Sequence, residues 1–236
     1  MLRRRNRLPC IPRSGEREQE VFEMASGKKT NTSPRIRYLV QLAVLVAILL
    51  LLEFTGIGMI KTPFLEFTVM QIPVIIGAIV LGPAAGAALG GVFGLLSFWE
   101  CFGKSAFGVT LMGISPVGTF LTCVPTRILM GLLCGLIFRG LIRADKSKSQ
   151  LLAFGGSSLA GSLLNTVLFT GVLTAAFYHT DYIQGIAQGF ADSTGLAMNP
   201  FLFVALFVGI QGVLEALIST VAGAAVSRAL YKALNH

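Results

Sequence analysis

Glycines recur at every fourth position in the segment 68–100, and this spacing constrains the fold more than any other feature of the sequence. The segment reads TVMQIPVIIGAIVLGPAAGAALGGVFGLLSFWE, two apolar stretches joined by Gly82-Pro83. Residues four apart share one helical face. A face of glycines lets the backbone of another helix come into van der Waals contact, which suits helix packing in lipid. The glycines of this predicted face are Gly82, Gly86, Gly90 and Gly94.

The bulk composition places the chain in a membrane. Hydrophobic residues make up 54% of the 236 residues and charged residues only 13%, and the mean hydropathy is +0.75. These values are too apolar for a soluble domain of this length. The net charge of +8 comes mainly from basic residues that precede the first long apolar run, and no basic stripe interleaved with aromatic residues follows. We therefore expect no nucleic-acid binding.

We divide the chain into a tail, residues 1–37, and a membrane domain, residues 38–234. The tail is polar and rich in Arg, Ser, Gly and Pro, which predicts a disordered cytoplasmic segment. It is not a signal peptide, because its basic region is followed by further charge instead of an apolar core. Two translation starts remain open, Met1 and Met24, since a short basic lead into the first apolar segment follows Met24 directly.

Apolar segments in the second region predict an all-α integral membrane protein, a bundle of six transmembrane helices. A membrane span needs about 20 helical residues. The second and third segments are shorter, so we expect them to lie in the protein interior or to extend into their flanking loops. The stretches between the third and fourth segments and between the fifth and sixth are expected to be loops. The six segments cover about 38–60, 69–81, 84–98, 119–142, 151–178 and 200–230.

The distribution of basic residues predicts the orientation of the bundle. With six spans and a cytoplasmic N-terminus, only two basic residues fall in the outer loops, Lys61 and Lys104. This arrangement satisfies the positive-inside rule, and the inverted one violates it. Both termini are therefore expected in the cytoplasm. The basic residues then placed inside are Arg139, Arg143, Lys146, Lys148, Arg228 and Lys232.

A small set of polar side chains lies within the apolar segments, where each is costly and normally faces a cavity or a partner. Most of them fall in the predicted outer half of the bundle, where they could line a pocket open to the outside. An intramembrane arginine with a fixed donor fork suits a ligand that bears a carboxylate. The predicted pocket residues are Gln71, Arg127, Asn165, Gln211 and Glu215.

Structural readings of the same residues remain open. Arg127 could pair with Glu215 or with Glu53 merely to be buried, and the glutamines could satisfy one another. Asn165 lies in GSLLNTVLFTG, among small residues, so a hydrogen bond between helices competes with a ligand contact.

Motifs of catalysis and of metal binding are absent from the sequence. It contains no GxxxxGK[ST] phosphate loop, no HExxH and no GxSxG. Its four cysteines and two histidines show neither zinc spacing nor a disulfide framework. We therefore expect no catalytic residue, no metal and no cofactor, and energy for any transport must come from elsewhere.

Three blocks in order carry a resemblance to a known family. They are VMQIPVIIGAIVLGPAAGAALGGVFGLLSF, ISPVGTFLTCVPTRILMGLLCGLIF and GSLLNTVLFTG. Together they resemble the substrate-binding S component of energy-coupling factor (ECF) vitamin transporters, over about residues 38–230. The resemblance implies a non-catalytic protein of the bacterial plasma membrane that captures a vitamin from outside. It also implies partners, a transmembrane T component and two ABC ATPases, against which the loaded S component topples to release its substrate inside.

The resemblance also assigns roles outside the pocket. The family carries an AxxxA motif in its first helix, and Ala43 and Ala47 stand at that spacing, which implies that they contact the T component. In such proteins the loop between the first two helices gates the pocket. Here that loop is GIGMIKTPFLEF. Gly56 and Gly58 give the backbone conformational freedom and Pro63 restricts it, a combination that a gating loop requires. A simple connector would contain the same residue types.

The first block looks most like S components assigned to pantothenate, a small carboxylate with an amide and hydroxyls. Arg127 would then hold the carboxylate, while Gln71, Asn165 and Gln211 would serve the amide and the hydroxyls. Glu215 lies one turn deeper than Gln211 on the same face. The sequence departs from the common LGPKAG form, with Ala84 where lysine is frequent. The alternatives are the same machinery for folate, cobalamin or another vitamin, and a membrane scaffold without a ligand.

Overall fold

The computed structural model of the protein describes residues 33–56, 58–61, 66–144, 150–195, 199, 202 and 212–234. Met1, Met24 and almost all of the predicted tail lie outside these residues, as do Pro63 and Gln211. The chain divides into two compact units, Met1–Arg37 and Tyr38–His236. The second unit contains every site described below.

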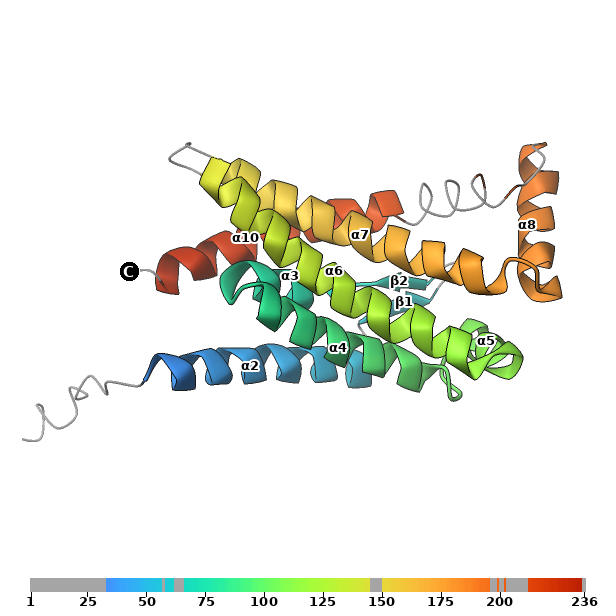
Figure 1. Cartoon of the computed structure of the whole chain (residues 1–236), viewed down its shortest axis with the longest axis horizontal. Helices are drawn as coiled ribbons and strands as arrows, with labels where there is room; N and C mark the ends of the chain where they lie inside the picture. The colour runs from blue at the N-terminus through green and yellow to red at the C-terminus, as the bar shows by residue number, and fades with distance from the viewer. Residues whose placement is uncertain are drawn as a thin grey trace, which may run out of the picture. The chain divides into compact units, whose positions relative to one another are not determined.

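The described residues are predominantly helical, as predicted, and they also form one small antiparallel sheet (Figure 1). The sheet pairs β1 (Met59–Lys61) with β2 (Glu66–Thr68), and Ile60 lies opposite Phe67. The helices are α2 (Pro34–Thr55), α3 (Gln71–Val80), α4 (Pro83–Glu100), α5 (Ala106–Ile114), α6 (Pro116–Ala144), α7 (Leu151–Phe177), α8 (Asp181–Thr194) and α10 (Val213–Leu234).

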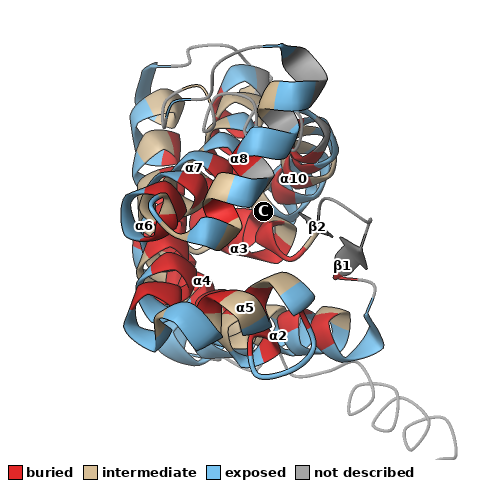
Figure 2. Ribbon diagram, turned by 90° about the vertical axis from the view of Figure 1, so that its right-hand side faces the viewer, coloured by how far each residue is buried: buried red, intermediate tan, exposed pale blue. Residues whose placement is uncertain are grey.

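Three of the described helices are long and apolar enough to cross a membrane: Pro34–Thr55, Pro116–Ala144 and Leu152–Phe177. By contrast, α3 covers only about 15 Å and is buried on nearly all sides (Figure 2). The expectation that this short segment lies in the protein interior is thereby confirmed. Large apolar side chains are exposed along α2, among them Leu39, Leu51 and Phe54. Such a surface is stable in lipid and costly in water.

The turn between α3 and α4 depends on a glycine. Gly82 has a φ of +102°, a conformation that side chains with a Cβ rarely adopt, and it is the N-cap of α4. Pro83 then occupies the first helical turn, where its missing N–H costs nothing. The two helices fold back on each other, and a Cβ built on Gly77 would collide with the side chain of Leu89.

The glycine face of α4 packs directly on the backbone of α6, as its spacing predicts. A Cβ at Gly86 or Gly90 would collide with a carbonyl group of α6, and one at Gly94 would lie 2.8 Å from Val124 Cα. Glycines of α6 complete the contact, because a Cβ at Gly131 would strike the carbonyl of Gly86. Gly82 is the exception among the four predicted glycines, since it forms the turn and not the face. Figure 1 shows α4 and α6 side by side.

The first helix is shorter than predicted. We expected it to continue to about Ile60, but α2 ends at Thr55, and Ile60 belongs to β1. Gly56 follows with a φ of +71°, in the left-handed region that ends helices. The predicted gating loop is therefore partly a β-hairpin, whose base is closed by a hydrogen bond of 2.9 Å from the Val69 N–H to the Gly58 carbonyl.

Two predicted loops contain helices. In the first, the Ser105 hydroxyl accepts a hydrogen bond from the Gly108 N–H and caps the start of α5. In the second, α8 places Ile183 and Ala187 in a buried cluster with Leu173 and Phe177 of α7. In the last predicted segment, about 200–230, the structure describes α10 from Val213 to Leu234.

The core runs along the contacts among α2, α3, α4, α6 and α7 (Figure 2). One buried cluster contains Phe93 of α4, which lies next to the glycine face, and this phenylalanine forms one wall of the site described next. The members of this cluster are Leu49, Met70, Val74, Leu89, Phe93 and Met130.

Candidate ligand-binding site

The glycine face of α4 sets the position of Arg127 on α6. A Cβ on Gly90 would collide with the carbonyl oxygen of Arg127. The two backbones therefore touch at this level because position 90 has no side chain. Pro125 lies in the same turn of α6 and supplies no N–H to the helix. The backbone around Arg127 is thus defined by one close contact and by one missing helical hydrogen bond.

The side chain of Arg127 is buried, with only 6% of its surface exposed. Its Nη1 donates to the Thr122 carbonyl at 3.1 Å and to Thr126 Oγ1 at 3.2 Å. The guanidinium also lies over two rings, at 5.2 Å from the centroid of Phe93 and at 4.4 Å from that of Phe169. Contacts with both ring faces and two hydrogen bonds fix the orientation of the donor plane.

The described part of the chain leaves one donor of this guanidinium, Nε, unused. Nε is buried and has no hydrogen-bond partner among the residues that the structure describes. The charges of Glu100 and Glu215 act on Arg127, which partly offsets the cost of burying the cation. A guanidinium presents two parallel N–H donors along an edge, and a carboxylate accepts both. The free edge can therefore bind a carboxylate side-on.

Gln71 joins three helices. Its side chain is fully buried, and Nε2 donates to Ser162 Oγ of α7 at 3.1 Å and to Ser219 Oγ of α10 at 2.8 Å. Oε1 has no partner among the described residues. Gln71 is therefore a polar link between helices, made to two serines and not to another of the predicted pocket residues, and one of its acceptors is unused by the described residues.

Asn165 lies on α7 between Ser162, which contacts Gln71, and Phe169, which contacts Arg127. It follows Ser162 by three residues and precedes Phe169 by four, so about one helical turn separates it from each. It is 5% exposed, and its Oδ1 has no hydrogen-bond partner within the described ranges. A buried amide oxygen without a donor costs about 1–3 kcal/mol. A ligand that supplies an N–H or O–H would recover that cost.

Glu215 contacts the hairpin. Its Oε1 accepts a hydrogen bond of 2.9 Å from the Thr68 N–H at the end of β2. It precedes Ser219 by four residues, so it lies about one turn of α10 from the bond to Gln71. The structure therefore places Gln71 and Glu215 around one junction of α3, α7 and α10. Further along α7 lie Asn165 and then Phe169, whose ring contacts Arg127 of α6. Gln211 lies outside the described residues.

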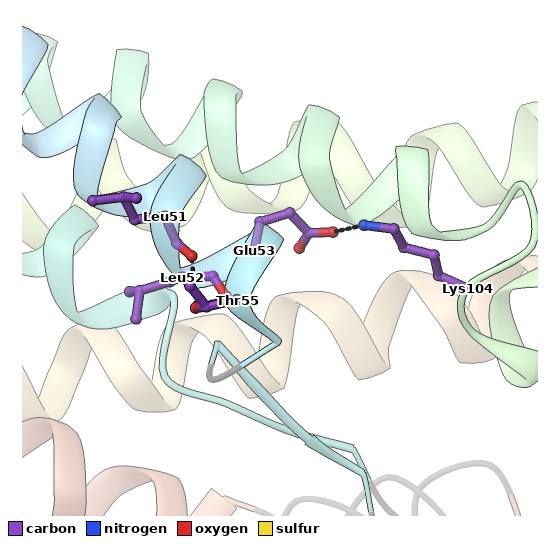
Figure 3. Close-up of polar contacts among 5 residues, drawn as sticks. All are labelled: Leu51, Leu52, Glu53, Thr55 and Lys104. Atoms are coloured by element: carbon purple, nitrogen blue, oxygen red, sulfur yellow. Dashed lines mark hydrogen bonds and ion pairs between the residues drawn. The ribbon is translucent and has the colours of Figure 1, made fainter.

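Glu53 has a partner other than Arg127. Lys104 Nζ lies 2.9 Å from Glu53 Oε1, and Figure 3 shows this ion pair between the end of α2 and the turn after α4. Lys104 also lies over the ring of Phe54 at 5.5 Å. The suggested pairing of Arg127 with Glu53 is therefore not the one that the structure forms.

Comparison with known proteins decides the family. Residues 37–226 match the family described as ECF transporter, substrate-specific component. The chain is 32% identical over 208 residues to the pantothenic acid transporter PanT of Lactococcus lactis subsp. cremoris, and the match covers 83% of this chain and 94% of the relative. It is 34% identical over 100 residues to the pantothenate transporter PanT of Leuconostoc mesenteroides, covering 42% of this chain and about half of that relative, 47%.

This chain belongs to the ECF substrate-specific component family. The resemblance noted in the sequence is thereby confirmed, and the apolar helices agree with the membrane protein that the family implies. Membership concerns nearly the whole of the second unit, so the buried polar residues described above lie within the matched region.

The predicted family motif in α2 lies on the surface. Ala43 and Ala47 are both exposed, and so are their neighbours Val44 and Ile48. Two alanines one turn apart leave a shallow strip in an otherwise bulky apolar face, which a helix of another protein can approach closely.

The predicted gating residues fall into different environments. Gly56 is exposed, whereas Gly58 is buried, and a Cβ there would lie 2.9 Å from both the Leu52 carbonyl oxygen and Met70 Cγ. Gly58 is therefore required for packing at the base of the hairpin. Pro63 lies outside the described residues.

The residues that hold the polar groups in place are not among those predicted from the sequence. Ser162 and Ser219 bind Gln71, and Phe93 and Phe169 enclose Arg127. One signal was available for Phe93, which follows Gly90 by three residues and so lies near the predicted contact face. For the others, the partner lies on a distant part of the chain, and no local pattern marks it.

Proposed function

We propose that this chain is the high-affinity substrate-binding subunit of an ECF-type importer and that its ligand is pantothenate. Family membership supports the subunit, and the names of the two relatives support the vitamin. The observation that carries the proposal is the free Nε edge of Arg127, held in a buried site by Thr122, Thr126 and two phenylalanine rings.

The chemistry of the free groups suits this ligand class. Pantothenate carries one carboxylate, one amide and two hydroxyls. The carboxylate would bind the Arg127 edge side-on, with charge-assisted hydrogen bonds. Asn165 Oδ1 and Gln71 Oε1 are acceptors without partners, so each would receive an N–H or O–H of the ligand. Gln211 remains a predicted contact, and Glu215 would act beside the ligand while it holds β2.

The transport cycle in this proposal depends on other proteins. The chain would be a non-catalytic subunit with six membrane helices and both termini in the cytoplasm, located in the bacterial plasma membrane. A transmembrane T component would bind the strip at Ala43 and Ala47, and two ABC ATPases would supply the energy. The hairpin between α2 and α3 would gate the pocket.

The decisive experiment identifies the ligand. We expect mass spectrometry of small molecules extracted from the purified protein to detect pantothenate, and a calorimetric titration of the stripped protein to show saturable binding. Folate and cobalamin serve as competing ligands in the same titration. Tight binding of another vitamin would replace the assigned substrate, and binding of none would favour a scaffold.

A matched pair of variants locates the site. Arg127→Gln removes the charge and the free edge, and we expect affinity to fall by about two orders of magnitude or more. Arg143→Gln changes the same residue type at an exposed position of the same helix and should leave affinity unchanged. Thermal unfolding of both variants checks that the fold is retained. Unchanged affinity in folded Arg127→Gln protein would show that the carboxylate binds elsewhere.

A further inference from the structure

Two cysteine thiols meet where the end of α4 approaches α6. Cys101 follows the last residue of α4 and forms its C-cap, and Cys123 lies within α6. They are 6% and 5% exposed and belong to one buried cluster with Val124. Both thiols are free, and they lie close enough for each to interact with the other.

The packing between the two helices creates this proximity. A Cβ on Gly94 would lie 2.9 Å from the Cys123 carbonyl oxygen, so the missing side chain lets α4 reach α6 at this level. Ser97 interacts with both thiols: its carbonyl accepts from Cys101 Sγ at 3.3 Å, and its side chain acts on Cys123. The two sulfur atoms thus share one neighbour from the last turns of α4.

The chain around Cys101 has the freedom that a covalent bond would need. Cys101 lies in a turn, and Gly103 follows with a φ of +148° and open space at its Cβ position. A disulfide needs a Cα–Cα separation of about 4.4–6.8 Å. A residue at the end of a helix can adjust to that separation more easily than one within it.

The thiol pair also lies beside the candidate ligand site. Cys123 precedes Arg127 by four residues, about 6 Å along α6. Among the described residues, no group of three His, Cys, Asp or Glu side chains could hold a metal ion. A pair of thiols without further metal ligands is suited to disulfide chemistry.

We propose that Cys101 and Cys123 form a reversible intramolecular disulfide that ties the end of α4 to α6 beside Arg127. The oxidant is a low-molecular-weight disulfide. One protein thiolate attacks it, which breaks the oxidant's S–S bond and forms a mixed disulfide. The second protein thiolate then displaces the remaining half. The two cysteines are oxidised and lose their protons, and the oxidant leaves as two thiols.

The bond would restrict ligand exchange. It links two helices one turn from the arginine, so relative movement of α4 and α6 at that end becomes limited. We expect the dissociation rate of a bound ligand to fall by about an order of magnitude on oxidation, because changes of this kind act mainly on dissociation. This effect rests on the proposed function, whereas formation of the bond does not.

The first arm of the test needs no ligand. The full-length protein in lipid nanodiscs is incubated with oxidised glutathione, alkylated under denaturing conditions and digested without reduction. We expect two of its four cysteines to escape alkylation and a peptide pair joined through Cys101 and Cys123, both reversed by dithiothreitol. Cys134→Ala serves as the control, since its thiol lies about 16 Å further along α6. Four alkylated cysteines, or a bond to any other cysteine, would overturn the proposal.

The second arm measures dissociation of labelled pantothenate from reduced and oxidised protein. The slower exchange should occur in the parent and in Cys134→Ala, and should vanish in Cys101→Ser and in Cys123→Ser. A disulfide that forms without changing dissociation would overturn its effect on the site. Protein that binds no pantothenate in either state would contradict the proposed function and leave the result of the first arm standing.

Discussion

At the scale of single residues, Arg127 is defined by what surrounds it more than by its own charge. Two hydrogen bonds occupy Nη1, and two aromatic faces fix the plane of the group. A flexible arginine would lose entropy each time it captured a carboxylate. An arginine that is already fixed loses this entropy on folding and not on binding, so more of the free energy of the interaction contributes to affinity.

Replacement of one aromatic ring tests this view. Phe169→Leu keeps an apolar side chain but removes the π face, and we expect a loss of about 1 kcal/mol, or about fivefold in affinity for the carboxylate ligand. Phe154→Leu is the control, since Phe154 is a second phenylalanine on α7 but packs against Phe138 and Tyr231. Calorimetry measures affinity, and thermal unfolding measures stability. Equal losses of affinity in the two variants would indicate a general packing effect.

The sequence identified the polar residues but not their partners. An ionisable or amide side chain within an apolar segment stands out whatever the fold, so Gln71, Arg127 and Asn165 could be named in advance. The hydroxyls that bind Gln71 could not, because Ser162 and Ser219 look like any small residue of a membrane helix. Their role arises only when three helices meet.

At the scale of helices and strands, the glycine spacing predicts a face on α4 that another helix can approach closely, and the structure identifies that helix as α6. The same rule could not give the small elements. The strands β1 and β2 have three residues each, too few for an alternating pattern to show within a Gly- and Pro-containing stretch. In α8, Ile183 and Ala187 lie four residues apart, as on one helical face, but two apolar residues in a polar stretch are too weak a pattern to predict a helix.

Adjacent glycines in α4 allow a controlled test of the contact. In Gly90→Ala the new Cβ collides with the Arg127 carbonyl, so α6 must move, and we expect destabilisation of about 1–3 kcal/mol together with weaker ligand binding. In Gly91→Ala the Cβ lies 3.6 Å from the Ile128 side chain, an ordinary contact. That variant should keep both properties and gain helix propensity. Thermal unfolding and titration of both proteins measure the difference. Similar behaviour of the two would show that the close approach at Gly90 is not required.

At the scale of the whole molecule, the exposed apolar surface has two uses. Most of it is suited to contact with lipid, as are the exposed large side chains of α2 and α10. The strip at Ala43 and Ala47 differs because small residues permit close approach of another helix. If the chain binds and leaves a coupling partner in each cycle, as proposed above, a contact of this kind suits it because no bulky side chain has to rearrange.

Substitution on this strip should separate transport from binding. We expect Ala43→Trp and Ala47→Trp to abolish uptake by cells that express the complete importer, while the purified variants bind ligand like the parent. Val221→Trp is the control, since position 221 is exposed on α10 and already apolar. Uptake of labelled vitamin and co-purification with the T component are the measurements. Normal uptake by both alanine variants would place the partner's contact elsewhere.

The packing of α4 against α6 has a consequence for how such proteins can diversify. On the α6 side, the contacts at Gly86, Gly90 and Gly94 are made largely by main-chain atoms, which every amino acid supplies. Substitutions that reshape the ligand-facing surface of α6 can therefore accumulate without disturbing the joint between the two helices. In this way, mutations at the pocket can change the ligand specificity of such a protein while the packing of its helices stays the same.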